Sequence, residues 1–182
     1  MQVITHYNIM TEKQEKILQS ALELFAKEGY NATSTNKVAK HAGVSEGLIF
    51  RHFTNKEGLL HAILKEGENK FKELFVDIVM DTDPKSVIKK SIQITDVIDK
   101  EDFDFWRLQF KLKWELEING DQKMEPLKMA LINAFTKLNY ESPEQEANLI
   151  LLINEGIGSS VLKGSSLDSK KMINFLLKKY NL

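Results

Sequence analysis

The sequence predicts an all-α protein of about nine helices, with a three-helix helix-turn-helix domain at its N-terminal end and a larger helical domain after it. Glycine and proline are sparse, at nine and three in 182 residues, and such a composition favours helices joined by short turns. Hydrophobic residues at 42% and charged residues at 28% are typical of a globular protein. The two domains are expected at residues 1–55 and 56–182.

Recognisable capping residues mark the first helices. Thr11 and Gln14 match a capping box, and the helix that begins there is expected to stop at Gly29. The next helices are expected from Thr33 or Ser34 to Gly43, from the N-cap Ser45 through His52, and from Thr54 or Asn55 onward. Beyond Asp83-Pro84 the expected helices span residues 84–98, 102–118, 123–138, 143–163 and 168–180.

One segment, residues 108–118, alternates apolar and polar residues without a break, which by itself favours a strand. We expect a helix, because only Ile118 is β-branched and no other segment offers a strand to pair with. Such a helix would be apolar on two opposite sides, and we therefore expect it inside the second domain. The two sides are Phe105, Leu108, Leu112 and Leu116, and Phe103, Phe110, Trp114 and Ile118.

Four aromatic residues on this helix are candidates for ligand binding, because ligand pockets are lined mainly by apolar and aromatic side chains. They are Phe103, Trp106, Phe110 and Trp114. Aromatic residues at helical spacing more often belong to an ordinary core, and both interpretations stay open. Asn154 and Glu155 follow an apolar run and are candidates for polar groups of a pocket or for dimer contacts.

The chain lacks the residues or motifs that several classes of chemistry require. There is no cysteine, which excludes disulfides, thiolate metal sites and a cysteine nucleophile. The histidines form no metal-binding spacing, no Gly-rich phosphate loop occurs, and no serine lies in a nucleophile motif. We therefore expect no enzyme activity, no metal and no cofactor. The chain also starts without a signal-peptide pattern, so a cytoplasmic protein without membrane contact is expected.

The formal net charge of −1 does not suggest a nucleic-acid partner, but the charge is unevenly distributed. Residues 34–56 carry Lys37, Lys40, Arg51 and Lys56 against Glu46 alone, a local charge of +3. Positive charge is thus concentrated in the segment where the helix-turn-helix pattern lies.

Residues 33–53 have the pattern of a helix-turn-helix pair. Val38 and Ala39 supply the inward face of its first helix, and Gly43 suits the left-handed backbone position that ends that helix. Ile49 and Phe53, four residues apart, turn the second helix toward the core. The opposite face of the second helix would then enter a DNA major groove, while the start of the first helix would contact phosphates.

The candidate DNA contacts lie on these two faces and on the helix that follows. Arg51 is suited to phosphate or to the O6 and N7 atoms of guanine, and Leu48 to a thymine methyl group. Gly47 would permit a close approach to DNA. The full set is Ser34, Thr35, Asn36, Lys37, Ser45, Glu46, Gly47, Leu48, Phe50, Arg51, His52 and Lys56.

Residues 16–64 resemble the tetracycline-repressor (TetR) family of bacterial transcription regulators. The segments that carry the resemblance are Phe25-Ala26-Lys27-Glu28-Gly29-Tyr30, Ala32-Thr33-Ser34, Val38-Ala39-Lys40, Ala42-Gly43-Val44-Ser45 and His52-Phe53-Thr54-Asn55-Lys56-Glu57-Gly58-Leu59-Leu60. The resemblance implies backbone contacts to DNA by His52 and Lys56. At Phe50 the family commonly has a tyrosine that contacts phosphate, so this chain departs from the pattern there.

The resemblance also implies a helical body that binds a small molecule and a homodimer formed by the last two helices. Candidate dimer residues are Leu149, Leu152, Ile153, Gly156, Ser160, Ile173, Leu176 and Leu177. The expected function is a ligand-responsive repressor that binds a palindromic operator in double-stranded DNA and is released by a small apolar or aromatic effector. A ligand-dependent activator and a helical enzyme or carrier are the alternatives.

Overall fold

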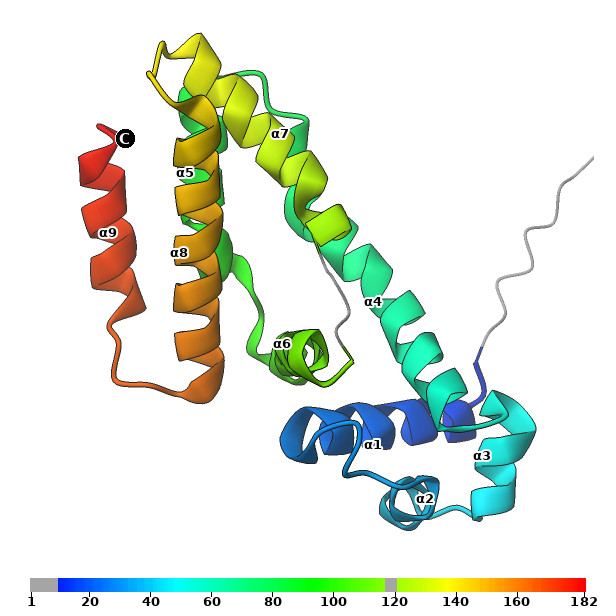
Figure 1. The fold of residues 1–182 in the computed structure, drawn as a ribbon. Helices are drawn as coiled ribbons and strands as arrows, with labels where there is room; N and C mark the ends of the chain where they lie inside the picture. Colours follow the sequence, from blue (N-terminus) through cyan, green and yellow to red (C-terminus); the bar gives the residue numbers. More distant parts are fainter. Residues whose placement is uncertain (1–9, 117–120) are drawn as a thin grey trace, which may run out of the picture. The chain divides into compact units, whose positions relative to one another are not determined.

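The computed structural model describes residues 10–116 and 121–182, with the backbone but not the side chains of residues 68, 69, 113, 114, 121 and 122. These described residues form nine α-helices, two short 3₁₀ helices and no strand (Figure 1). The prediction of an all-α fold is confirmed. The chain divides into two compact units, residues 1–66 and 67–182. The functional division expected between residues 55 and 56 stays a prediction.

Unit 1 contains three helices and the start of a fourth. The bounds are α1 Glu12–Glu28, α2 Thr35–Ala42, α3 Glu46–Phe53 and α4 Lys56–Val79, of which residues 56–66 belong to unit 1. Thr11 forms the predicted capping box, since its hydroxyl accepts from the Gln14 backbone N–H at 3.3 Å and its own N–H donates to the Gln14 side chain at 2.8 Å. Gly29 then ends α1 at a φ of 102°, where a side chain would be strained.

The core of unit 1 is built from all four helices. Its fully buried apolar side chains are Ile17, Ala21 and Phe25 of α1, Val38 of α2, Ile49 of α3 and Leu59 of α4. Val38 and Ile49 are inward-facing residues that the sequence predicts for α2 and α3. Their burial is the main stabilising contribution to the unit, because each removes a large apolar surface from water.

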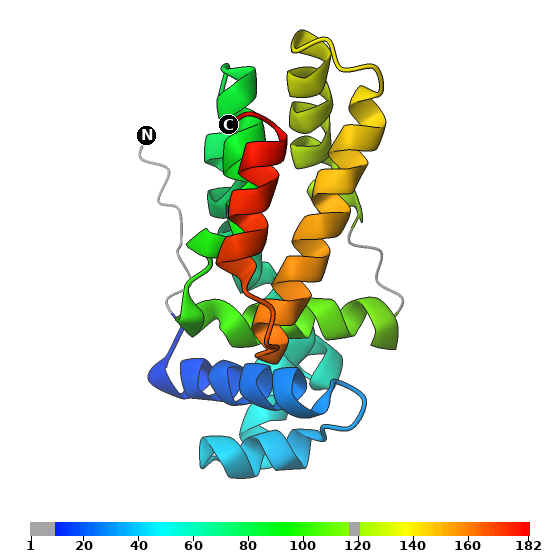
Figure 2. The same ribbon diagram turned by 90° about the vertical axis from the view of Figure 1, so that its left-hand side faces the viewer.

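Unit 2 contains the rest of α4 and the remaining helices. They are α5 Pro84–Ile92, η1 Ile94–Val97, η2 Lys100–Asp102, α6 Phe103–Glu115, α7 Asp121–Lys137, α8 Pro143–Lys163 and α9 Ser169–Lys179. Helix α7 packs on both α5 and α8, and α9 packs on α5 (Figure 2). The largest fully buried side chains of these helices are Ile88, Ile92, Leu108, Leu112, Leu127, Leu131, Phe135 and Ile150.

The alternating segment is helical, as expected, because α6 covers most of it. Phe105, Leu108 and Leu112 form its buried face, whereas Phe103 and Phe110 on the opposite side are only half-buried. On α4, Gly67 makes room for this helix: a Cβ at Gly67 would lie 1.9 Å from the Phe105 ring. The predicted contributions of Trp114 and Ile118 lie outside the side chains or residues described.

The prediction of one helix over residues 84–98 is wrong. Helix α5 ends at Ile92, and the separate 3₁₀ helix η1 follows. Ile92 and Ile94 are both buried. In a continuous α-helix two residues two positions apart point about 200° away from each other, so the end of α5 lets both side chains reach the same core.

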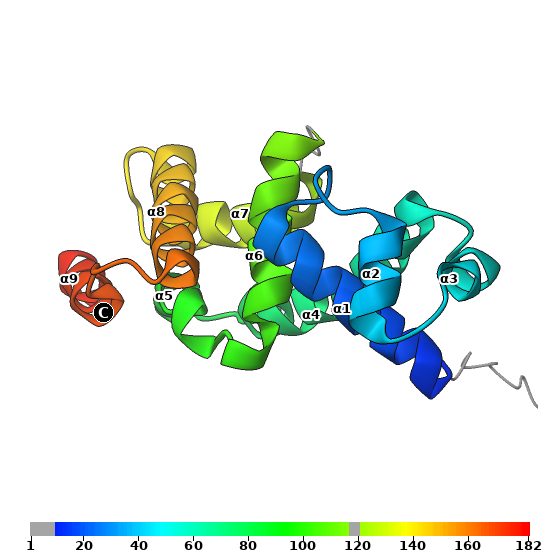
Figure 3. The ribbon, with the colours of Figure 1, turned by 90° about the horizontal axis from the view of Figure 1, so that it is seen from below.

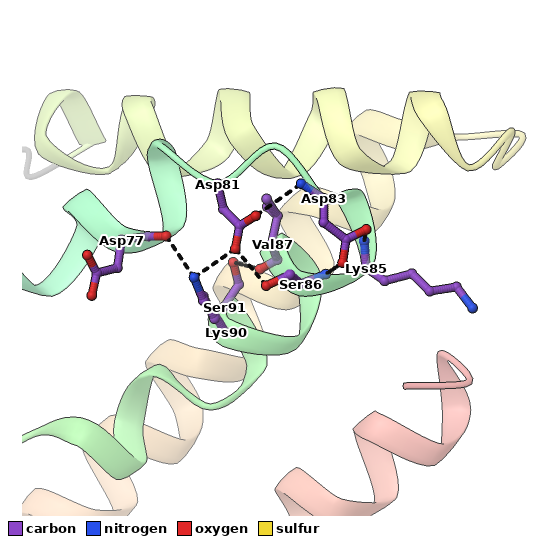
Figure 4. Close-up of polar contacts among 8 residues, drawn as sticks. All are labelled: Asp77, Asp81, Asp83, Lys85, Ser86, Val87, Lys90 and Ser91. Atoms are coloured by element: carbon purple, nitrogen blue, oxygen red, sulfur yellow. Dashed lines mark hydrogen bonds and ion pairs between the residues drawn. The ribbon is translucent and has the colours of Figure 1, made fainter.

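The turn between α4 and α5 is held by a polar network around Asp81 (Figure 4). Its carboxylate accepts from the Ser86 hydroxyl at 2.6 Å and from the Lys90 ammonium at 2.7 Å. The backbone N–H of Asp83 donates to the same carboxylate at 3.0 Å. Lys90, with these other donors, holds the pKa of Asp81 well below its usual range. Asp83 itself is the N-cap of α5 and accepts from the Ser86 N–H at 3.1 Å.

Within residues 10–116 and 121–182, no helix is both long and apolar enough to cross a membrane.

Candidate nucleic-acid interface

Helices α2 and α3 are joined by a tight turn, as the sequence pattern predicts (Figure 3). Gly43 occupies the left-handed conformation at φ 68° and ψ 33°, and its N–H bonds back to the last turn of α2. The next N–H, that of Val44, donates to the Ala39 carbonyl at 3.0 Å. Val38, Ala39 and Ile49 are buried. This packing turns the opposite face of α3 away from the core of unit 1.

The outward face of α3 carries an arginine, a phenylalanine and a glycine. Arg51 is exposed and makes no ion pair or hydrogen bond with the described residues. The Phe50 ring is 48% exposed, although an aromatic ring of this size would normally be packed against the protein. A Cβ at Gly47 would meet no atom within 4 Å. Nothing inside unit 1 therefore requires glycine at this position.

Glu46, at the start of α3, is bonded to the start of α2. One carboxylate oxygen accepts from the Thr35 hydroxyl at 2.6 Å, and the other accepts from the Asn36 amide at 3.2 Å. These two hydrogen bonds, of which that from Thr35 has the larger effect, lower the pKa of Glu46, so its carboxylate is ionised at neutral pH. Three residues predicted to contact DNA thus contact one another, and they fix the start of α3 against the start of α2.

Two of the basic residues on α2 have acidic neighbours on α1. Lys37 forms an ion pair with Glu28, and the His41 Nε2 lies 3.7 Å from a Glu23 oxygen. Lys40 is exposed. Pairing with α1 reduces the charge that Lys37 presents to a phosphate, so the positive character of this surface depends mainly on Lys40 and Arg51.

Lys56, the first residue of α4, is directed into unit 1. Its ammonium donates to the Tyr30 carbonyl at 2.9 Å and to the Thr33 carbonyl at 3.0 Å. It also lies 4.3 Å from the centroid of the Tyr30 ring, within the range of a cation–π interaction. Two of its three donors are therefore used inside the protein, and its observed contacts hold α4 to the loop between α1 and α2.

The starts of α2 and α3 differ in their capping. The Ser34 hydroxyl accepts from the Lys37 N–H at 3.2 Å and caps α2. Ser45 occupies the predicted N-cap position of α3, but its side chain makes no capping hydrogen bond. Ser45 is exposed. Leu48 and His52 of α3 are half-buried.

The candidate ligand residues all lie in unit 2. Trp106 is buried in an aromatic cluster, with its ring centroid 4.8 Å from Phe71 and 5.3 Å from Phe105. Phe103 and Phe110 are half-buried, and the side chain of Trp114 lies outside the described residues. The sequence does not single out Phe71 or Phe105 as ligand residues, because Phe71 lies on another helix and its approach to Trp106 depends on how the helices pack.

The candidate dimer residues separate into an exposed and a buried group. Leu149, Leu152 and Gly156 are exposed on α8, while Ile153, Ser160 and Leu177 are half-buried. Ile173 and Leu176 lie in the core of their own unit, and their expected contact with a second chain stays a prediction. The exposed large apolar residues of α9 are Met172 and Phe175. They directly precede Ile173 and Leu176 in the sequence.

Sequence comparisons match the N-terminal segment to known regulators. Residues 17–63 match the family model described as bacterial regulatory proteins, tetR family. A relative from Bacillus subtilis, the uncharacterised HTH-type transcriptional regulator YerO, is 37% identical over 100 residues, which cover 52% of this chain and 34% of the relative. The matched segments span about a third of the length of the first curated relatives.

Solved structures match along nearly the whole chain. A putative transcriptional regulator from Saccharomonospora viridis in complex with choline has a TM-score of 0.72 at 18% identity, covering 93% of this chain and 97% of that one. AibR, in complex with isovaleryl coenzyme A and operator DNA, has a TM-score of 0.69 at 18% identity, covering 91% and 96%. At these identities the likeness concerns the fold. The match over residues 17–63 shows that this N-terminal segment is similar to the bacterial regulatory proteins of the tetR family.

Proposed function

We propose that this protein is a ligand-responsive transcription regulator that binds a palindromic operator as a homodimer and is released by a small molecule. The observation that carries the proposal is the outward face of α3. It presents Arg51 without an internal partner, an exposed Phe50 ring and a glycine that the protein's own packing does not need. A helix of this length fits the major groove, which is about 12 Å wide.

Each group on this face has a role in the proposal. Arg51 pairs with a guanine edge or a phosphate. Phe50 has no hydroxyl, so it packs on sugar or methyl groups instead of donating to a phosphate. Ser34 and Lys37 at the start of α2, with the Ser45 hydroxyl, hold the phosphates on either side. Glu46 and Lys56 act within unit 1 by positioning α3 and α4.

The proposed homodimer uses the exposed apolar residues of α8 and α9. Leu152 is 66% exposed and Phe175 is 62% exposed, and Leu149 and Met172 lie one turn away from them on the same helices. A two-fold dimer would cover this face and place two α3 helices about 34 Å apart, one turn of DNA. Two copies of unit 1 (the two heads of the dimer) at that spacing require two DNA half-sites, which is why we propose a palindromic operator.

Proteins of the same fold support a small-molecule effector without identifying it. One of the similar structures is a complex with choline, and another is a complex with isovaleryl coenzyme A and operator DNA. In the proposed mechanism the effector binds unit 2 and favours a separation of the two heads that does not fit the operator. The factor by which the effector lowers operator affinity cannot exceed the ratio of its own affinities for the two states.

An electrophoretic shift assay with DNA from the chain's own upstream region tests the DNA-binding part. The wild-type protein should bind a discrete site with an affinity that falls steeply as salt rises. Arg51→Ala should reduce operator binding by at least tenfold while leaving the helical circular-dichroism signal unchanged. Lys65→Ala is the matched control, since Lys65 is an exposed cation of the same unit outside the 34–56 segment. Equal binding to unrelated DNA of the same length would contradict the proposal.

A further inference from the structure

Three polar atoms of unit 2 are buried without a hydrogen-bond partner among the described residues. They are the hydroxyl oxygen of Thr95, the amide nitrogen of Gln109 and the amide oxygen of Asn154. They come from three different elements, η1, α6 and α8. Because native proteins leave few buried polar atoms unpaired, three of them in one unit indicate that something else supplies their partners.

The three elements meet beside Gly158 of α8. A Cβ at Gly158 would lie 3.6 Å from the Phe110 ring and 3.8 Å from the Thr95 methyl group. Gln109 precedes Phe110 on α6, and Asn154 lies one turn before Gly158 on α8. Asn154 and Gly158 are both buried. Thr95, the Phe110 ring and Asn154 therefore lie around Gly158, where the missing side chain leaves space for a methyl-sized group, and Gln109 is the neighbour of Phe110 along α6.

The orientation of the Asn154 amide is fixed by a contact with α5. Its nitrogen donates to the Ser91 carbonyl at 2.9 Å. A carbonyl accepts only from a donor, so the nitrogen must face Ser91 and the oxygen must be the unpaired atom. The side chain is only 8% exposed. Asn154 thus offers a buried acceptor in a defined direction.

The neighbourhood contains donors and acceptors but no unpaired charge among the described side chains. Thr95 can donate or accept, Gln109 offers a donor and Asn154 an acceptor. Helix α6 carries three cations. Arg107 already donates to the Leu162 carbonyl at 2.9 Å and to Asp104 at 2.8 Å, Lys111 is also not without a partner, and the side chain of Lys113 lies outside those described. A charged molecule buried here would lose its hydration without gaining a counter-charge, which is strongly unfavourable.

We infer that unit 2 binds an uncharged small molecule that carries a hydrogen-bond donor, an acceptor and an apolar or aromatic part. Thr95, Gln109 and Asn154 hold its polar groups, and Phe110 packs on its apolar part. The inference rests on the proposed function in one respect only, that such a molecule serves as the effector. The absence of charge on the ligand distinguishes this site from one that selects an organic cation or an anion.

Benzamide and its two charged analogues are suitable probes. In benzamide, the carbonyl has two lone pairs that match the Gln109 and Thr95 donors, the NH₂ group matches the Asn154 acceptor, and the ring matches Phe110. Benzoate and benzamidinium have nearly the same shape but carry a negative and a positive charge. Titration calorimetry with the full-length protein, without DNA, should show one benzamide per chain and an affinity at least about tenfold higher than for either analogue.

Thr95→Val and Thr136→Val form a matched pair of variants. Thr95→Val should weaken benzamide about fivefold, the worth of one hydrogen bond, without lowering the melting temperature, because the lost hydroxyl has no partner in the free protein. The Thr136 hydroxyl is exposed and bonds to the Ile132 carbonyl of its own helix, so Thr136→Val should leave the affinity unchanged. Gln109→Leu gives a second, independent test with the same expectation as Thr95→Val.

Three outcomes would overturn the inference: no benzamide binding, equal binding of a charged analogue, or an affinity that Thr95→Val and Gln109→Leu leave unchanged. None of these would affect the DNA-binding proposal, which the Arg51→Ala shift assay tests separately. Conversely, selective benzamide binding by a protein that binds no operator would contradict the proposed function and leave this site standing.

Discussion

At the scale of single residues, the surface of unit 1 that we propose to face DNA contains side chains whose role cannot be inferred from residue type alone. Lys56 has the charge of a phosphate contact, yet it donates to two carbonyls of its own unit. Glu46 has the wrong charge for a surface that meets phosphates, yet it holds the start of α2. Function at this scale depends on which partners the fold has already supplied.

Gly47→Ala should change stability and DNA binding in opposite directions. The added Cβ meets no atom within 4 Å, and alanine favours a helix over glycine by about 1 kcal/mol. The melting temperature should therefore rise by a few degrees. If α3 enters the major groove, the same methyl group lies between helix and DNA, and operator affinity should fall. Thermal melting and shift assays on one preparation measure both, and an unchanged affinity would place Gly47 away from DNA.

Glu46→Ala should reduce the preference for operator over unrelated DNA. Loss of the hydrogen bonds to Thr35 and Asn36 frees the start of α3, and correct placement of that helix matters only for specific binding. A carboxylate that merely repelled phosphates would behave differently, because its removal would strengthen binding to both DNAs equally. The ratio of the two affinities distinguishes these outcomes. Thr35→Val, which removes one of the two hydrogen bonds, should give a smaller change of the same sign.

At the scale of elements, capping and turn residues predict where most helices begin, and tertiary packing decides where some of them end. Thr11 and Gly43 have the capping and left-handed conformations that their positions predict. No sequence signal marks the end of α5 at Ile92, because no glycine or proline follows it. That end allows Ile92 and Ile94 to enter one core, which is a property of the packed unit.

The α4–α5 turn should lose stability in acid because of Asp81. Lys90 and Ser86 hold the pKa of its carboxyl below the ordinary value of 3.8. Its stabilising contribution is therefore complete above that ordinary value and is lost as the pH falls toward the lower folded pKa. Asp81→Asn should lower the melting temperature at pH 7, and the gap from wild type should shrink at pH 3. A gap of the same size at both pH values would show that the charge of Asp81 contributes nothing.

At the scale of the whole molecule, how chains assemble is the property that the sequence predicts least well. The apolar spacing of α9 does not reveal which residues face its own core, and Ile173 and Leu176 prove to be buried there. The Glu46 network is equally invisible in the sequence, because Thr35 and Glu46 lie on different helices whose crossing brings them together. By contrast, the helix-turn-helix pattern is short and local, and it could be predicted in detail.

Leu152→Glu should convert the proposed dimer to a monomer. Leu152 is 66% exposed in the single chain, so the substitution should leave the fold intact, while a carboxylate there would be buried without a partner in a dimer. Sedimentation velocity would report the change in mass. Met80→Glu is the control, since Met80 is also exposed but follows α4 and belongs to neither α8 nor α9. A wild-type monomer, or a Leu152→Glu protein that remains dimeric, would contradict the assignment of this face.

The contacts of Lys56 have a consequence for chemical footprinting. Its amine is half-buried, donates to two carbonyls and lies over the Tyr30 ring, whereas the amine of Lys40 is exposed. A reagent that acylates free amines therefore reaches Lys40 readily and Lys56 only when unit 1 opens. In an experiment that maps DNA contacts by protection of lysines, Lys56 would be an internal reference for folding, and Lys40 is the residue that the proposed DNA complex should protect.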